Sequence, residues 1–180
     1  VMPSAHAIDR EWRVLTALRG TAVPVAAPLH YCDDRAVLGT PFYLMEELDG
    51  RVFHEFATPG LARAERAALY ESMVVTMAAI HRLDVAALGL ADYGRAGNYF
   101  ARQLSRWTKQ YQASVTGPND AMDRLIDWLP QNIPDGARDE AMVSVVHGDF
   151  RLDNLMFHPT EARVLAVLDW ELSTIGHAMA

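Results

Sequence analysis

Residues 145–154 read VVHGDFRLDN and concentrate several polar groups in a short stretch. The β-branched pair at its start predicts a strand that ends just before Asp149, and Asn154 follows a few positions later. A carboxylate at a strand end can accept a proton from a hydroxyl nucleophile, and an amide oxygen is a suitable ligand for Mg²⁺. Further on, the apolar run VLAVL at 164–168 ends at Asp169, which could bind the same ion together with phosphate oxygens. A base, a neutral ligand and an anionic ligand in this order indicate phosphoryl transfer.

The composition is that of an ordinary globular protein. The 180 residues are 51% hydrophobic and 22% charged, and the net charge of −7 disfavours nucleic-acid binding, which requires a basic surface. Cys32 is the only cysteine, so no internal disulfide can form. No apolar run approaches the roughly 20 residues of a membrane span, and the first residues do not resemble a signal peptide. We therefore expect a cytoplasmic protein with neither a membrane nor a nucleic-acid partner.

Helical and strand patterns follow one another along the chain. The first predicted helix lies between a cap at Ser4 and a terminating Gly20, and its apolar stripe includes Glu11, a carboxylate that must either reach water or find a partner. The other predicted elements are strands over 28–34 and 41–48, helices over 62–83, 98–114 and from 119 to about 129–134, and strands within 142–147, 154–158 and 163–171. This order indicates a small α/β part that leads into a mainly helical part.

Single residues in the second half carry specific expectations. Asn98 and Asn119 each precede a helix and are predicted to cap it. Trp107 and Trp128 lie within these helices, where core packing is a more common role than stacking on a substrate. His147 is expected to be buried and to brace the loop that carries Asp149.

The segment HGDFRLDN, followed by VLDWE, resembles the aminoglycoside phosphotransferase and choline kinase-like family, distant relatives of protein kinases. AIDREWRVLTAL resembles the small-lobe helix of that family, and FYLMEELDG resembles the strand and hinge that lie along the adenine. ELSTIGH resembles a subset related to the kinase-like domain found with acyl-CoA dehydrogenases. The resemblance covers most of the chain and implies an α/β (α+β), protein-kinase-like fold with two lobes.

The resemblance implies a role for each matching position. Asp149 corresponds to the catalytic base, and Asn154 and Asp169 correspond to the Mg²⁺ ligands. Glu11 corresponds to the helix Glu that pairs with a nucleotide-anchoring Lys, which would explain a carboxylate on an apolar stripe. The positions that would line the hinge beside the adenine are Met45, Glu46, Glu47 and Leu48.

The expected function is the transfer of a phosphoryl group from ATP, with Mg²⁺, to a hydroxyl of a small molecule. Aminoglycoside-like, choline-like and hydroxyacyl compounds are all compatible acceptors. Residues 1–48 are expected to form part of a small N-lobe that is truncated, and residues 49–180 part of a mainly helical C-lobe. The missing initiator Met and the ending STIGHAMA indicate a piece of a longer protein. The sequence leaves the acceptor, the choice of ATP over GTP and the oligomeric state open.

Two other functions remain open. Lys109 is the only lysine and lies in a predicted helix of the larger lobe, so no Lys precedes Glu11 in this sequence. A nucleotide-binding module without catalysis is therefore an alternative. The other is a metal-dependent hydrolase, with ligands drawn from His147, Asp149, Asp153 and His158.

Arg151 lies between the two acidic residues of the motif. It could add positive charge near the phosphates of the nucleotide, or it could form an ion pair with Asp153, which is the simpler expectation.

Overall fold

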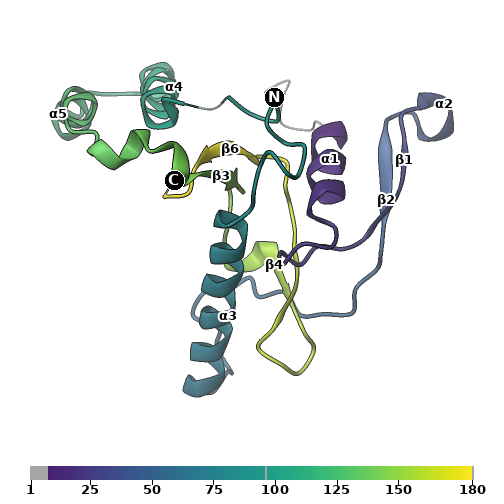
Figure 1. The fold of residues 1–180 in the computed structure, drawn as a ribbon. Helices are drawn as coiled ribbons and strands as arrows, with labels where there is room; N and C mark the ends of the chain where they lie inside the picture. The colour runs from purple at the N-terminus through teal and green to yellow at the C-terminus, as the bar shows by residue number, and fades with distance from the viewer. Residues whose placement is uncertain (1–7, 96, 180) are drawn as a thin grey trace.

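The structure, a computed structural model, describes residues 8–95 and 97–179 (Figure 1). The predicted cap at Ser4 lies outside these residues. The helices are α1 (Ile8–Leu18), α2 (Arg35–Leu38), α3 (Arg63–His81), α4 (Tyr99–Ser114) and α5 (Asp120–Trp128). The strands are β1 (Pro28–Cys32), β2 (Phe42–Met45), β3 (Val143–Val146), β4 (Leu155–Phe157), β5 (Val164–Val167) and β6 (Thr174–His177). The predicted mixture of helices and strands is thus observed.

Helix α1 follows its predicted amphipathic pattern. Val14, Leu15 and Leu18 are buried on one face. The helix ends because Gly20 adopts a left-handed conformation with φ 80°, which allows the amide of Thr21 to bond the carbonyl oxygen of Leu18 at 3.0 Å. Helix α1 therefore stands against the rest of the molecule with its polar side outward.

Strands β1 and β2 form an antiparallel hairpin beside α1 (Figure 1). The connection between the two strands contains α2, which was not predicted, and the side chain of Asp34 caps this short helix by accepting from the amide of Ala36. The ring of Trp12 on α1 lies 5.9 Å from that of Tyr31 and 6.1 Å from that of Tyr43. Aromatic contacts thus attach the hairpin to α1.

The second half folds around two more antiparallel pairs, β3 with β6 and β4 with β5. Strand β6 was not predicted as a strand; Ile175 lies opposite Val145 in the pair and is buried. Helix α3 packs on β3, where the hydroxyl of Ser144 donates to the carbonyl oxygen of Ile80 at 2.8 Å. These pairs bring the predicted catalytic loop and the Asp169 strand together.

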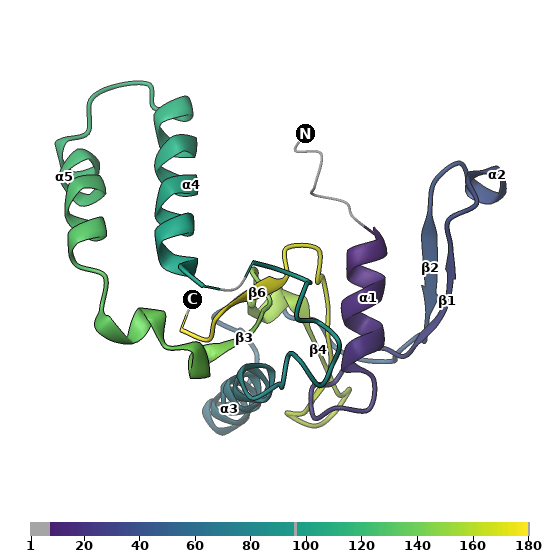
Figure 2. The same cartoon turned by 45° about the horizontal axis from the view of Figure 1, so that its top comes forward.

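Helices α4 and α5 run side by side as a hairpin away from the rest of the molecule (Figure 2). The structure describes both helices throughout and neither contains a buried residue. The predicted core packing of Trp107 and Trp128 is wrong, because each is 56% exposed. Asn119 caps α5 as predicted, whereas Asn98 makes no side-chain cap bond to α4 and has φ 46°.

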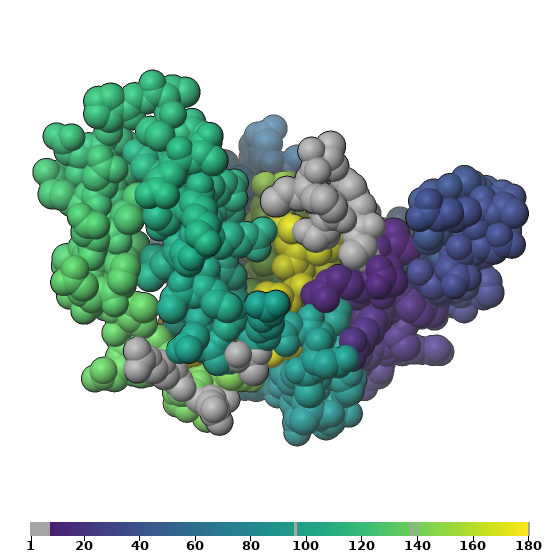
Figure 3. All heavy atoms as spheres, turned by 90° about the horizontal axis from the view of Figure 1, so that it is seen from above, coloured from purple at the N-terminus to yellow at the C-terminus, as the bar shows by residue number. Residues whose placement is uncertain are grey.

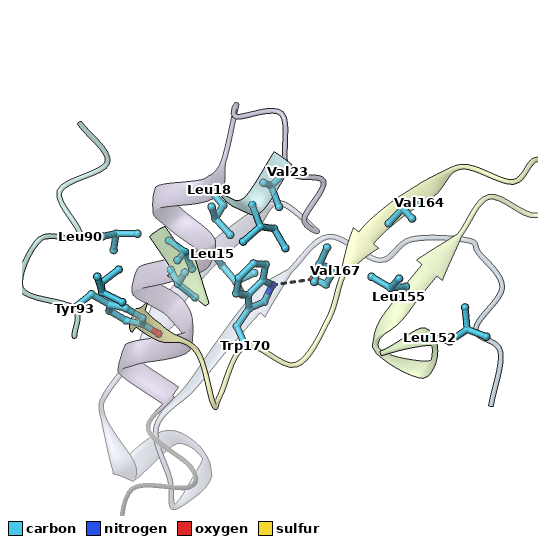
Figure 4. Close-up of a cluster of buried hydrophobic side chains, with 14 of the residues drawn as sticks. Leu15, Leu18, Val23, Leu90, Tyr93, Leu152, Leu155, Val164, Val167 and Trp170 are labelled. Carbon is cyan, nitrogen blue, oxygen red and sulfur yellow. Dashed lines mark hydrogen bonds between the residues drawn. The ribbon is translucent and has the colours of Figure 1, made fainter. Parts of the chain in front are cut away.

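A hydrophobic cluster joins α1 to the strands of the second half. Figure 4 shows it extending from Leu90 and Tyr93, past Leu15, to Val167 and Trp170. The Trp170 side chain has no exposed surface, and its indole N–H donates to the carbonyl oxygen of Val167 at 3.0 Å. In the part of the chain that the structure describes, no helix combines the length and the apolar character needed to cross a membrane.

Candidate active site

The predicted catalytic loop turns sharply at Gly148, directly after β3. Its φ of 89° lies in the left-handed region, and an added Cβ would stand 2.6 Å from the carbonyl oxygen of Leu172. Only glycine meets both conditions without displacing the backbone. The turn brings the half-buried Asp149 out of the strand and close to the segment that follows Asp169.

Asn154 lies directly against Asp149. Its amide nitrogen donates to the backbone oxygen of Asp149 at 2.9 Å and to the carboxylate Oδ2 at 3.1 Å. Because these bonds identify the nitrogen, the amide oxygen of the buried Asn154 points to the other side and is available as a ligand. The loop thus brings together a carboxylate and an amide oxygen.

His147 braces this loop from a buried position, as predicted. The amide of Asp149 donates to its Nδ1 at 3.3 Å, so Nε2 carries the proton and donates to the carbonyl oxygen of Leu168 at 2.8 Å. Burial lowers the pKa of His147 more than the Leu168 carbonyl and the nearby carboxylates raise it. With both nitrogens engaged, His147 is a neutral connection between the two loops.

Asp169 follows β5 with φ 62°, a left-handed conformation that is uncommon for a residue with a side chain. The preceding residue, Leu168, donates its amide to the backbone oxygen of Asn154 at 2.9 Å, which fixes the strand end beside the catalytic loop. Although burial lowers the pKa of His147 more, the negative charges of Asp169 and Asp149 both raise it. The structure therefore brings Asp149, Asn154 and Asp169 into one neighbourhood.

Glu11 reaches the same neighbourhood from α1. Its Oε1 accepts from the amide of Trp170 at 3.3 Å, and the hydroxyl of Tyr43 bonds its carboxylate. Burial is the main cause that raises the pKa of Glu11, and the charges of Asp169 and Glu171 raise it further. Burial beside Glu11 also raises the pKa of Tyr43. Glu11 is therefore half-buried and bonded rather than at the water-facing edge of the stripe.

Arg151 forms the predicted ion pair with Asp153, at 2.9 Å between Nη2 and Oδ2. Its Nε also lies 3.4 Å from Oδ2 of Asp149. The guanidinium is half-exposed, so a phosphate could reach it from solvent.

The predicted hinge begins at Met45, the last residue of β2, and continues through residues 46–48 as an irregular segment. The amide of Glu46 donates to the carbonyl oxygen of Ala27 at 2.9 Å, which aligns the segment beside the chain that enters β1. Among the contacts of the described residues, no hydrogen bond or ion pair joins the segment to Asp149, Asn154 or Asp169.

The donor set fits Mg²⁺ rather than a transition metal. Within residues 8–95 and 97–179, no group of three or more His, Cys, Asp or Glu side chains is arranged to bind a metal. Mg²⁺ commonly takes one or two protein oxygens and completes its shell with phosphate oxygens and water, which an Asn and an Asp can satisfy. The hydrolase alternative is disfavoured because both nitrogens of His147 are engaged and His158 accepts backbone amides in its own turn.

The local sequence pattern did not identify Tyr43, Trp170 or Ser173 as neighbours of the site. Tyr43 bonds Glu11 across a large separation in the chain, and Trp170 contributes a backbone amide, which any residue type could provide.

Comparisons with known proteins identify the family of the chain. The model of the "Phosphotransferase enzyme family" matches residues 2–180. Acyl-CoA dehydrogenase family member 11 of Rattus norvegicus is 52% identical over 180 residues, which are 100% of this chain and 23% of that protein. The chain thus spans about a quarter of the length of the curated relatives it matches.

Solved structures show the same fold. A Ralstonia eutropha protein, named provisionally as an aminoglycoside phosphotransferase, is 57% identical with a TM-score of 0.92, over 98% of this chain and 53% of that one. An aminoglycoside phosphotransferase in complex with AMP-PNP and hygromycin B is 17% identical with a TM-score of 0.65, over 97% of this chain and 59% of that one.

Proposed function

Since the chain belongs to the phosphotransferase enzyme family and has its protein-kinase-like fold, we propose that it contributes the catalytic groups of an ATP-dependent kinase acting on a small-molecule hydroxyl. The observation that carries the proposal is the contact of Asn154 with Asp149, together with the bond from Leu168 to Asn154. These contacts gather the base and both proposed metal ligands at two adjoining loops.

Asp149 is the proposed general base. Asn154 and Arg151 both lie against its Oδ2, which leaves Oδ1 as the oxygen we assign to the acceptor hydroxyl. A carboxylate fixed at one oxygen can orient the hydroxyl and receive its proton as the phosphoryl group is transferred.

Asn154 and Asp169 are the proposed Mg²⁺ ligands. When bound, the ion would neutralise the charge of the transferring phosphoryl group. The bond from Leu168 to Asn154 maintains the spacing of the two ligands, and neutral His147 holds the backbone on both sides.

The nucleotide is proposed to lie between residues 1–48, as part of a small and truncated N-lobe, and residues 49–180, as part of the C-lobe. The adenine would contact the hinge, which consists of Met45, Glu46, Glu47 and Leu48. Glu11 would orient a cation that anchors the phosphates. Arg151 would meet the phosphates by exchanging one of its two carboxylate partners.

The acceptor is proposed to be a small alcohol. One relative of known structure is bound to the aminoglycoside hygromycin B, and a more similar relative is named as an acyl-CoA dehydrogenase family member. Together with the choline-like compounds that the sequence resemblance implies, aminoglycoside and hydroxyacyl compounds are the three classes to compare.

The test is ATP consumption by the full-length protein with a panel from these three classes, measured as ADP release. Asp149→Ala should lower turnover by roughly 10²–10⁴-fold and leave nucleotide affinity unchanged. Asp33→Asn, an exposed Asp between β1 and α2, is the matched control and should retain turnover. Nucleotide binding without turnover across the panel would instead support a non-catalytic module.

A further inference from the structure

A second polar network lies on the side of α1 next to Glu11. It consists of Arg10, Tyr93 and Ser173, which come from α1, from the segment after α3 and from the turn after Asp169. The side chains of Tyr93 and Ser173 are buried, with 2% and 3% of their surfaces exposed. Buried polar groups connected in this way resist displacement, because breaking one bond leaves a partner unsatisfied.

The bonds of this network run from α1 to both other segments. The guanidinium of Arg10 donates to the carbonyl oxygens of Tyr93 at 2.9 Å and Ser173 at 3.3 Å. It also lies over the Tyr93 ring, 4.2 Å from the centroid. One cation thus binds both segments to the helix that carries Glu11.

The hydroxyl groups complete the network. Ser173 donates its single hydroxyl proton to the carbonyl oxygen of Trp170. Tyr93 is therefore the donor in the 2.7 Å contact with Ser173, and its hydroxyl lies 3.3 Å from the carbonyl oxygen of Arg10 as well. The carbonyl of Trp170 belongs to the residue whose amide binds Glu11. The network therefore fixes the turn directly after Asp169.

We propose that Arg10, Tyr93 and Ser173 are positioning residues that hold the Asp169 turn and the Glu11 helix in the arrangement that accepts a Mg²⁺–nucleotide complex. This inference rests on the proposed function, because it assigns Asp169 to the metal. The network touches neither the proposed base nor the proposed ligands; it acts through the backbone of residues 170–173 and through α1.

The neighbouring pair of Arg13 and Asp92 provides a matched control. Arg13 binds the carboxylate of Asp92 and the carbonyl oxygen of Gly89, so it also ties α1 to the segment after α3. Unlike Tyr93, however, Asp92 is exposed and has no bond to the Asp169 turn among the described contacts. A variant at Asp92 therefore tests whether attachment to α1 alone accounts for any effect.

The experiment measures the affinity of the full-length protein for ADP by calorimetry, with and without Mg²⁺. Tyr93→Phe keeps the ring and removes the hydroxyl, and it should weaken the Mg²⁺-dependent binding about fivefold while binding without Mg²⁺ stays unchanged. Ser173→Ala should have the same effect, and the double variant should be no weaker than either single one. Asp92→Asn should change neither affinity.

Asp169→Asn separates the two proposals. If it weakens Mg²⁺-dependent binding and Tyr93→Phe does not, the positioning role is wrong and the proposed function stands. An equal loss in Tyr93→Phe and Asp92→Asn also overturns the positioning role. If Asp169→Asn has no effect, the metal assignment is wrong, and the role of the network is wrong with it.

Discussion

In the candidate active site the loops are held by buried, bonded residues, whereas the α4–α5 hairpin leaves its largest side chains exposed. His147 and Trp170 fill the space between the catalytic loop and the Asp169 turn, with ring centroids 4.6 Å apart. Trp107 and Trp128 have 56% of their surface exposed. Figure 3 shows the C-terminal segment, in yellow, at the bottom of the space between α4 and α1. The active-site loops are therefore fixed by their own buried contacts, whereas the α4–α5 hairpin leaves aromatic side chains exposed.

The largest expected effect separates two tryptophans. Trp170→Ala removes a fully buried ring and should destabilise the protein by about 3–5 kcal/mol. Trp107→Ala removes an exposed ring and should change stability by less than about 0.5 kcal/mol. Chemical denaturation of the full-length variants measures both. A comparable loss in the two variants would show that another part of the protein covers the hairpin.

The second prediction concerns the backbone of the site. Gly148→Ala should cost about 2–4 kcal/mol, because the new Cβ meets the Leu172 carbonyl oxygen and φ is positive. Gly136→Ala is the control, since a Cβ there meets nothing within 4 Å. Thermal unfolding measures the difference, and equal melting temperatures for the two variants would contradict the tight approach of the loops.

The smallest effect is a pH dependence that arises from His147. The pKa of His147 is lowered in the folded state. Below about pH 6.5 this side chain is therefore protonated in the unfolded chain while it is still neutral in the folded chain. Stability from this group is present above that pH and is lost as pH falls toward the folded pKa, at up to about 1.4 kcal/mol per pH unit. Denaturation between pH 8 and pH 5 should show a shallower slope for His147→Gln than for wild type. His158→Gln should retain the wild-type slope.

The sequence predicted those parts of the structure that depend on the type and spacing of neighbouring residues. The Gly148–Asp149 turn, the helix that ends at Gly20 and the buried position of His147 all follow from residue type and spacing. The convergence of Asn154 on Asp149 agrees with the short loop between them.

Other parts depend on partners far away in the chain. Strand β6 exists because β3 is available to pair with it, and its sequence TIGH carries no alternation of its own. Asn98 makes no cap bond, and its φ of 46° lies outside the extended region that capping residues normally adopt. The network of Tyr93 and Ser173 joins residues 80 positions apart, which no local pattern reveals.

The central claim is that the side chains of Asn154 and Asp169 bind one divalent ion beside Asp149. A crystal structure of the full-length protein with AMP-PNP and Mn²⁺, located by its anomalous signal, tests it most directly. We expect the ion within about 2.0–2.3 Å of the Asn154 amide oxygen and an Asp169 oxygen. An ion bound at His147 or His158 would contradict the claim. So would an ion from which the side chains of Asn154 and Asp169 are turned away.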